Sequence, residues 1–264
     1  MRHSILTAAI TGALVWSAAT PVRLSAQAKA ETSTSASKVP RMPDGHPDLS
    51  GVWWRGADIG GRGGQPLGGR GGTPAPTFAS LYQPSAQAKA KTLSDKDDPS
   101  LGCTSTAFGT LNVSMFDVGA VAQIVQTPKF VIMLTETYHG FQIIPFDGRP
   151  HRDSVPPANR GDAVGRWEDD TFVVDKTNFT DTSWISAEGR VSFHSDALHV
   201  VERYRRVDAK TLEIEATLED SKVLSKPWVV PKQTLVLAPF DQIMALDCSP
   251  GDTPALIDAA AKQK

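Results

Sequence analysis

The sequence predicts a mainly β protein: a single antiparallel β-barrel or a sandwich, with one short helix. From residue 121 onward, apolar and β-branched residues alternate with polar ones, the period of strands with one buried face. Tight-turn signals such as Asp147-Gly148 and Asp208-Ala209-Lys210 separate these runs. Eight or so short strands with short connections favour a closed barrel or a sandwich, because both dispose of exposed sheet edges.

We expect the following strands in chain order: 121–126, 130–138, 141–146, 171–175, 199–207, 211–218, 233–239 and 242–247. The first two are separated by Thr127-Pro128-Lys129, which resembles a hairpin break. The best helix candidate is 85–93, because Pro84 stands just before it and its residues favour helix.

The segment 211–220 shows the cleanest alternation, with an apolar face and a face of glutamates. Opposite charges facing each other across strands are stabilising, so we expect Arg203 and Arg205 outside, beside the glutamates. This arrangement points Glu202 and Tyr204 inward. A register shifted by one residue would instead place His199 inside. An inward Glu202 indicates either a structural ion pair or a polar group in a ligand cavity.

The chain has the features of an exported protein. Residues 1–28 combine basic Arg2, an apolar stretch and a small-x-small end at Ala26-Gln27-Ala28, as in a cleavable signal peptide. The apolar stretch is about 15 residues, short of the roughly 20 that span a bilayer, and no later segment is apolar for long enough. We therefore expect a periplasmic or secreted protein with no membrane span after cleavage; the alternative is an uncleaved N-terminal anchor.

About 236 residues would remain after cleavage, which fits one large β domain. Residues 29–40 are small and polar, which predicts a flexible leader before a domain at 41–264. Within that domain, residues 55–77 are rich in glycine and poor in apolar anchors, so we expect a mobile surface loop.

The two cysteines, Cys103 and Cys248, both follow the predicted signal peptide. An oxidising compartment would pair them, so we predict a disulfide. It would close a loop of about 145 residues, for which the chain-entropy model gives a ceiling near 5 kcal/mol. Two unrelated buried thiols are the alternative.

Charge and motifs exclude several classes of function. A net charge of −2 and a pI near 6.3 provide no basic field for nucleic acid or anionic lipid. The sequence has no dinucleotide-binding βαβ fingerprint, no G-x-S-x-G nucleophile elbow and no H-E-x-x-H metal helix. We therefore expect no cofactor and no metal, and the oligomeric state stays open.

Cofactor-free acid–base chemistry needs an ionisable group held against an apolar cavity. The candidates for a catalytic role are His139, His194, Asp196, His199 and Glu202. The candidates for ligand contacts are Tyr138, Arg149, His151, Asp153, Trp167 and Tyr204. The alternative is structural: single histidines satisfied by local hydrogen bonds, Arg149 and Asp153 bracing the loop after Gly148, and Glu202 in a structural network.

Two resemblances accompany these patterns. Residues 48–53, DLSGVW, are similar to the G-x-W segment that opens the first strand of lipocalin-like, or calycin, barrels, and a second glycine-x-tryptophan stands at 165–167. More extensively, the chain resembles a group of secreted bacterial proteins of no settled function. The segments concerned are 41–53, 98–103, 146–151, 164–179 and 198–215.

The second resemblance implies export but assigns no catalytic residues. Where a C-H-E-like continuation would be expected, this chain has Cys248-Ser249-Pro250, so any role for a histidine after that cysteine is absent.

Together these patterns lead us to expect an exported barrel that binds a small, largely apolar molecule. It could act on that molecule as a cofactor-free isomerase, lyase or hydratase. The alternatives are a non-catalytic carrier with the same fold and an interaction module at the cell envelope.

Overall fold

The computed structural model describes residues 38–54, 56, 76–108, 121–136, 140–185 and 191–244, all within the compact unit Ala36–Lys264. The predicted signal peptide and most of the leader and glycine-rich loop lie outside these residues. So do three candidate residues, Tyr138, His139 and Cys248.

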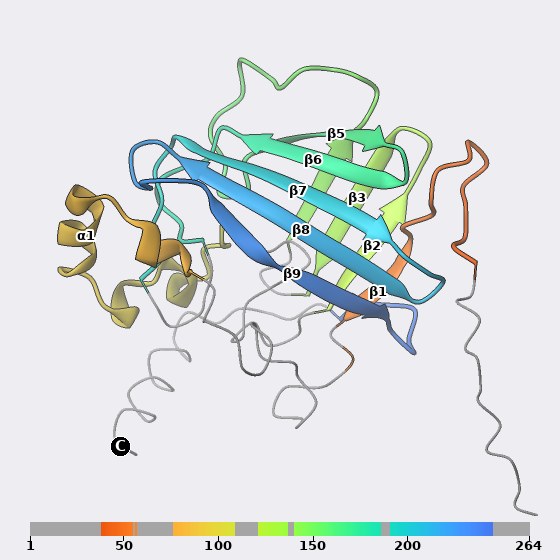
Figure 1. Cartoon of the computed structure of the whole chain (residues 1–264), viewed down its shortest axis with the longest axis horizontal. Helices are drawn as coiled ribbons and strands as arrows, with labels where there is room; N and C mark the ends of the chain where they lie inside the picture. The colour runs from red at the N-terminus through yellow and green to blue at the C-terminus, as the bar shows by residue number, and fades with distance from the viewer. Residues whose placement is uncertain are drawn as a thin grey trace, which may run out of the picture. The chain divides into compact units, whose positions relative to one another are not determined.

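The described residues form nine strands and one α-helix (Figure 1). The strands are β1 (Gly51–Trp54), β2 (Ala122–Gln126), β3 (Phe130–Thr135), β4 (Phe141–Pro145), β5 (Asp162–Glu168), β6 (Thr171–Thr177), β7 (Leu198–Arg206), β8 (Thr211–Asp220) and β9 (Trp228–Leu237). The helix α1 (Pro84–Ala90) begins at a proline, which suits the first helical turn. Short 3₁₀ turns flank it at Phe78–Leu81, Asp95–Asp97 and Pro99–Gly102.

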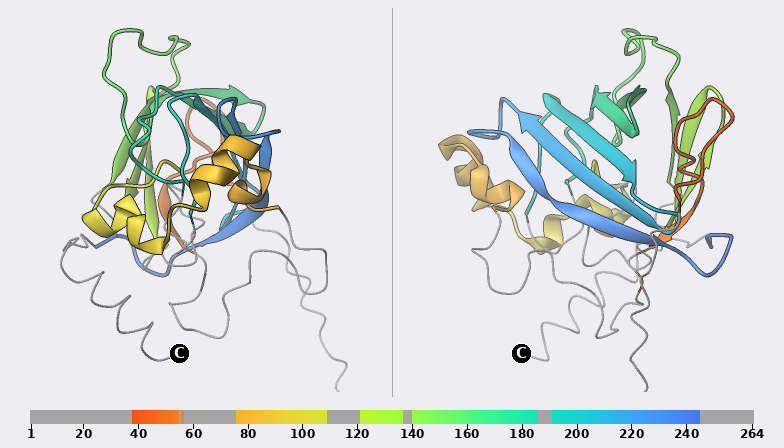
Figure 2. Two further views of the ribbon diagram at one scale, coloured as in Figure 1. Left: turned by 90° about the vertical axis from the view of Figure 1, so that its left-hand side faces the viewer. Right: turned by 45° about the vertical axis from the view of Figure 1, so that its right-hand side comes forward.

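All nine strands belong to one sheet, in the order β4-β3-β2-β1-β9-β8-β7-β6-β5, and every hydrogen-bonded pair is antiparallel. Strands adjacent in the chain are therefore adjacent in the sheet, except at the two ends of the order. The sheet curls so that these ends, β4 and β5, approach each other (Figure 2). The prediction of a mainly β, single antiparallel barrel with one short helix is confirmed.

Strands β4 and β5 meet without a ladder of hydrogen bonds. Eight successive antiparallel pairings separate them in the sheet, so the two strands run in the same direction. We call this junction the seam. Gly165 of β5 leaves room for two side chains, because a Cβ there would come within 2.5 Å of Phe172 Cζ of β6 and 3.1 Å of Ile144 Cγ2 of β4.

The hairpin of β7 and β8 has the predicted faces. Arg203 lies opposite Glu215, and Arg205 lies opposite Glu213. Glu202 and Tyr204 point inward, with 2% and 1% of their surfaces exposed. The predicted register is therefore confirmed, and the shifted register that would bury His199 is wrong.

Two strand predictions need correction. Residues 162–168 form β5, although only the resemblance drew attention to them, because Gly165 and Arg166 interrupt the apolar alternation. Gln242–Met244 do not form the expected last strand. The rest of that segment lies outside the described residues.

The interior of the sheet holds one of two apolar clusters, which we call the barrel core. It is built from inward-facing residues of all nine strands and from Leu49, and its largest fully buried side chains include Trp53, Phe172, Tyr204 and Met133. Trp53 Nε1 donates to Leu49 O at 2.9 Å, which satisfies the polar atom of this buried ring.

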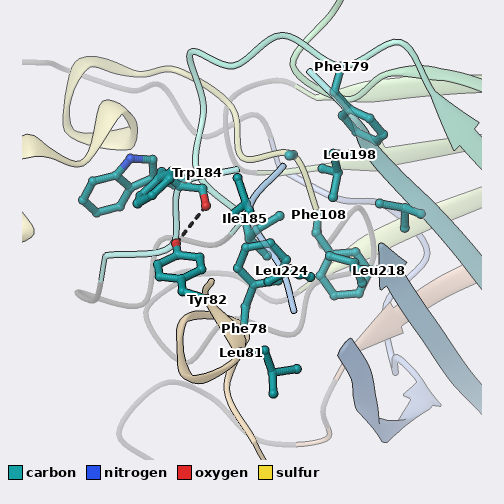
Figure 3. Packing of buried hydrophobic residues seen from close by; sticks show 14 of the residues in the cluster. Phe78, Leu81, Tyr82, Phe108, Phe179, Trp184, Ile185, Leu198, Leu218 and Leu224 are labelled. Atoms are coloured by element: carbon teal, nitrogen blue, oxygen red, sulfur yellow. Dashed lines mark hydrogen bonds between the residues drawn. The ribbon is translucent and has the colours of Figure 1, made fainter. Parts of the chain in front are cut away.

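The second cluster, the end core, lies between the helical segment and one end of β7, β8 and β9 (Figure 3). Phe78, Leu81 and Tyr82 pack there against Leu218 and Leu224. Tyr82 OH donates to Phe193 O at 2.8 Å. Along the described stretches, no helix combines the length and the apolar character needed to cross a membrane.

Candidate functional site

A buried ionic group lies inside the barrel, and we call it the interior triad. Lys176 is at the end of β6, and Glu202 and Tyr204 follow each other on the inner face of β7. Lys176 Nζ lies 2.7 Å from Glu202 Oε2. Tyr204 OH donates to the same oxygen at 2.7 Å. One carboxylate oxygen therefore accepts from two buried donors, which is the pairing that a buried charge needs.

Burial dominates the electrostatics of the triad. Loss of solvation lowers the pKa of Lys176; the charge of Glu202 opposes this effect, whereas that of Arg160 reinforces it. Loss of solvation also raises the pKa of Tyr204 well above its ordinary value, and the adjacent Glu202 carboxylate adds to the increase. Tyr204 therefore remains a neutral donor. The ammonium of Lys176 loses its proton more easily than that of an exposed lysine.

Polar side chains extend this group toward the seam. On β4, the buried Gln142 donates through Nε2 to Arg160 O at 3.0 Å. Arg160 Nη2 in turn donates to Thr135 Oγ1 at the end of β3, at 3.3 Å. The other amide atom of Gln142, Oε1, is buried and finds no hydrogen-bond partner among the residues that the structure describes. A buried acceptor without a donor is costly, so this oxygen is an unusual feature of the interior.

Trp167 on β5 is the second buried polar group at the seam. Its ring packs against the barrel core and stacks on His46, with centroids 4.6 Å apart and planes 5° from parallel. Its Nε1 is also buried without a hydrogen-bond partner. The two strands of the seam thus present one acceptor and one donor that the described residues leave unsatisfied.

The outer surface holds a separate histidine group. His151 Nε2 and His199 Nε2 approach the same atom, Asp175 Oδ1, at 3.0 and 3.1 Å. His151 Nδ1 lies 3.1 Å from Asp162 Oδ2, and His199 Nδ1 lies 3.5 Å from Glu219 Oε2. Each imidazole therefore lies between two carboxylates, and Asp175 is shared by both.

Asp162 fixes the loop before β5 to the sheet. Its side chain accepts from Arg152 N at 3.0 Å and Arg152 Nε at 2.6 Å, besides contacting His151. Burial alone would raise the pKa of Asp162, but the hydrogen bonds from Arg152 and His151 outweigh it and hold the pKa below its ordinary value.

The structure separates His194, Asp196 and His199. His194 is buried between Ser183 Oγ and Ser195 O, at 3.1 and 2.9 Å, and burial lowers its pKa. Asp196 forms an exposed ion pair with Lys222. His199 faces outward toward Asp175, so the three residues do not form one catalytic group.

Other candidates have local roles. Arg149 pairs with Asp147 beside the turn, at 2.5 Å, and Asp153 is exposed. Cys103 is not a free thiol. Its predicted partner Cys248 lies outside the described residues, so the pairing of the two stays a prediction.

Sequence reasoning missed Lys176 and Gln142. It also missed Asp175, which bridges His151 and His199. The expected strand ended at residue 175, so Lys176 was not assigned to a face. Extending the alternation from Phe172 through Val174 would have placed Lys176 inside, because all three share one face of β6.

The fold and the interior triad define a mainly β, barrel-shaped protein with a buried polar group. No family model, curated protein or solved structure matches the chain. Within the described ranges, no group of three or more His, Cys, Asp and Glu side chains is arranged to hold a metal ion.

Proposed function

We propose that the chain is an exported protein that binds a small, largely apolar molecule inside the barrel, at the seam. The ligand in this proposal has one hydrogen-bond donor, which Gln142 Oε1 accepts. The observation behind this proposal is that buried, unsatisfied oxygen among apolar residues. Pockets for small molecules combine mostly apolar walls with a few polar groups that fix orientation.

The seam supports the proposal as a route of entry. β4 and β5 are not joined by a hydrogen-bond ladder, so moving them apart breaks no backbone pairing between them. At the junction the Ile144 side chain of β4 instead approaches the backbone of β5 at Gly165. The barrel core lines the inner side of both strands and would provide the apolar walls.

The interior triad favours acid–base catalysis as a second candidate function. A lysine with a lowered pKa next to a carboxylate can accept and return a proton without a cofactor. A cofactor-free isomerase, lyase or hydratase would use such a pair, whereas a carrier would need only its shape. Export and likeness to lipocalin-like barrels belong to this proposal and rest on the sequence alone.

Phenol and toluene test the proposed hydrogen bond to Gln142 Oε1. They have nearly the same shape, but phenol has a hydroxyl donor where toluene has a methyl group. Their affinities for the purified full chain are measured by ligand-observed NMR. A hydrogen bond to an otherwise unsatisfied acceptor contributes about 1.4 kcal/mol, or tenfold in affinity. We therefore expect Gln142→Met to lower the phenol-to-toluene affinity ratio about tenfold.

Gln233→Met is the matched control, since Gln233 is also buried on the inner face of the sheet. It should leave the ratio unchanged. Absence of binding by both compounds, or a ratio that Gln142→Met does not alter, would contradict the proposal.

A further inference from the structure

The connection between β4 and β5, residues 146–161, ties the two sides of the seam together. Figure 1 shows it as the large loop above β5. The seam has no ladder of hydrogen bonds, so its closure depends on other contacts. His151, Arg152 and Arg160 of this connection make such contacts across the seam, and we call these three residues the clasp.

The first part of the connection leaves β4 and holds β5 and β6. His151 Nδ1 lies 3.1 Å from Asp162 Oδ2 at the start of β5, and His151 Nε2 lies 3.0 Å from Asp175 Oδ1 of β6. Arg152 donates to the same Asp162 through its backbone N at 3.0 Å and through Nε at 2.6 Å. The chain that leaves β4 is therefore fixed to two strands beyond the seam.

The last part of the connection leads into β5 and holds β3 and β4. Arg160 O accepts from Gln142 Nε2 of β4 at 3.0 Å, and Arg160 Nη2 donates to Thr135 Oγ1 of β3 at 3.3 Å. The guanidinium also lies so close to Gly140 that a Cβ there would overlap it. The chain that enters β5 is therefore fixed to two strands on the other side of the seam.

The clasp lies at the end of the seam where Gln142 is buried. Ile144 of β4 approaches Gly165 of β5, and the two strands run in the same direction, so Gln142 lies near the start of β5. At the other end of the seam, the rings of Phe146 and Phe172 pack edge to face, with centroids 5.8 Å apart. The polar end of the seam is therefore the end that leads to Gln142 Oε1.

We propose that the clasp is a gate that must open before a ligand reaches Gln142. This inference rests on the binding site proposed at the seam and adds how entry to that site is controlled. The amide whose Oε1 would accept from the ligand donates to the clasp through its Nε2. The gate and the site therefore share one side chain.

The outer contacts of the clasp suit repeated opening. The side chain of Arg152 is 64% exposed and that of His151 is 28% exposed, so water can replace their contacts when they break. Partly exposed polar contacts contribute less to stability than buried ones. Opening at this end therefore costs less than breaking the buried ion pair of the interior.

A gate of this kind changes rates rather than affinity. His151 contacts Asp175 on the outer surface of the sheet, so its contacts are the same with and without a ligand in the interior. Removing them raises the open population of both the free and the bound protein. The rate constants of association and dissociation then rise by the same factor, and the dissociation constant does not change.

Phenol binding to the isotope-labelled full chain tests this proposal, with rate constants obtained from NMR line shapes along a titration. We expect His151→Ala to raise both rate constants about tenfold, since it removes two polar contacts of the clasp. The dissociation constant should equal that of the wild type.

His199→Ala is the matched control, because His199 approaches the same oxygen, Asp175 Oδ1, at 3.1 Å but comes from β7 rather than from the connection. It should keep the wild-type rate constants. Circular dichroism confirms folding. Arg152→Gln, which removes the guanidinium contact with Asp162, replaces His151→Ala if that variant does not fold.

The outcomes separate the gate from the binding site. Phenol binding with wild-type rate constants in His151→Ala would overturn the gate and leave the site standing. Equal acceleration by His199→Ala, or a change in the dissociation rate constant alone, would also overturn the gate. Absence of phenol binding to the wild-type chain would overturn the site and the gate together.

Discussion

The ion pair of Lys176 and Glu202 shows how one buried charge depends on an opposite charge beside it. Both side chains are almost fully buried and lie 2.7 Å apart. Removing one partner of such a pair leaves an uncompensated charge in an apolar interior, whereas replacing both by apolar residues is often neutral. The pair is therefore a sensitive probe of the interior.

We predict that Lys176→Met lowers the free energy of unfolding by about 3–5 kcal/mol, because it leaves the buried Glu202 carboxylate without the ammonium, and with the neutral Tyr204 OH as donor. The combined variant Lys176→Met, Glu202→Leu should recover most of that loss. Urea unfolding followed by circular dichroism measures both.

Lys222→Met provides the comparison, because Lys222 and Asp196 form an ion pair of similar length, 2.6 Å, with both side chains exposed. Screening by water makes such pairs contribute little. Equal losses for Lys176→Met and Lys222→Met would contradict the buried pair described for the interior.

At this scale the sequence predicted part of the site. Alternation along β7 correctly placed Glu202 and Tyr204 inside, because opposite charges on β8 fixed the register. The proximity of His151 to His199 could not be predicted. It depends on how the loop before β5 folds over β6, which alternation does not report.

At the scale of elements, Asp162 joins the long connection after β4 to the start of β5. Its pKa is held below the ordinary value of 3.8 in the folded state. A carboxyl with a lowered pKa stabilises the fold above its unfolded pKa, and this contribution is lost as pH falls through the folded value. The loss should therefore begin near pH 4 and continue below it.

We predict that Asp162→Asn reduces the fall in the free energy of unfolding between pH 4 and pH 2.5. The reason is that the amide cannot take up the proton that destabilises the wild type. Urea unfolding at a series of pH values measures the slope. A variant with the wild-type slope below pH 4 would show that the Arg152 and His151 contacts do not stabilise the carboxylate.

The sequence predicted a strand best where its two faces differ clearly in polarity. β8, with its glutamates and apolar residues, was placed almost completely. β5 was missed because Gly165, which makes room for Phe172 and Ile144, also breaks the alternation of its strand. The residue that allows close packing at this place is therefore the one that concealed the strand.

For the whole molecule, a closed sheet followed from the number of strands and their short connections. The seam could not be predicted in this way, because the direction of β4 relative to β5 depends on the pairing of β9 with β1. That pairing joins residues distant in the chain and leaves no local signature. The proposed ligand site lies at the seam, so the sequence could locate neither the seam nor the site.

The most direct test of ligand binding at the seam is an NMR titration of the isotope-labelled full chain with phenol. Two signals report on the interior: the side-chain amide of Gln142 and the indole Nε1–H of Trp167. The proposal predicts that the Gln142 signal shifts in a saturable manner and that the Trp167 signal moves with it. Unchanged signals from both side chains at saturating phenol would contradict it.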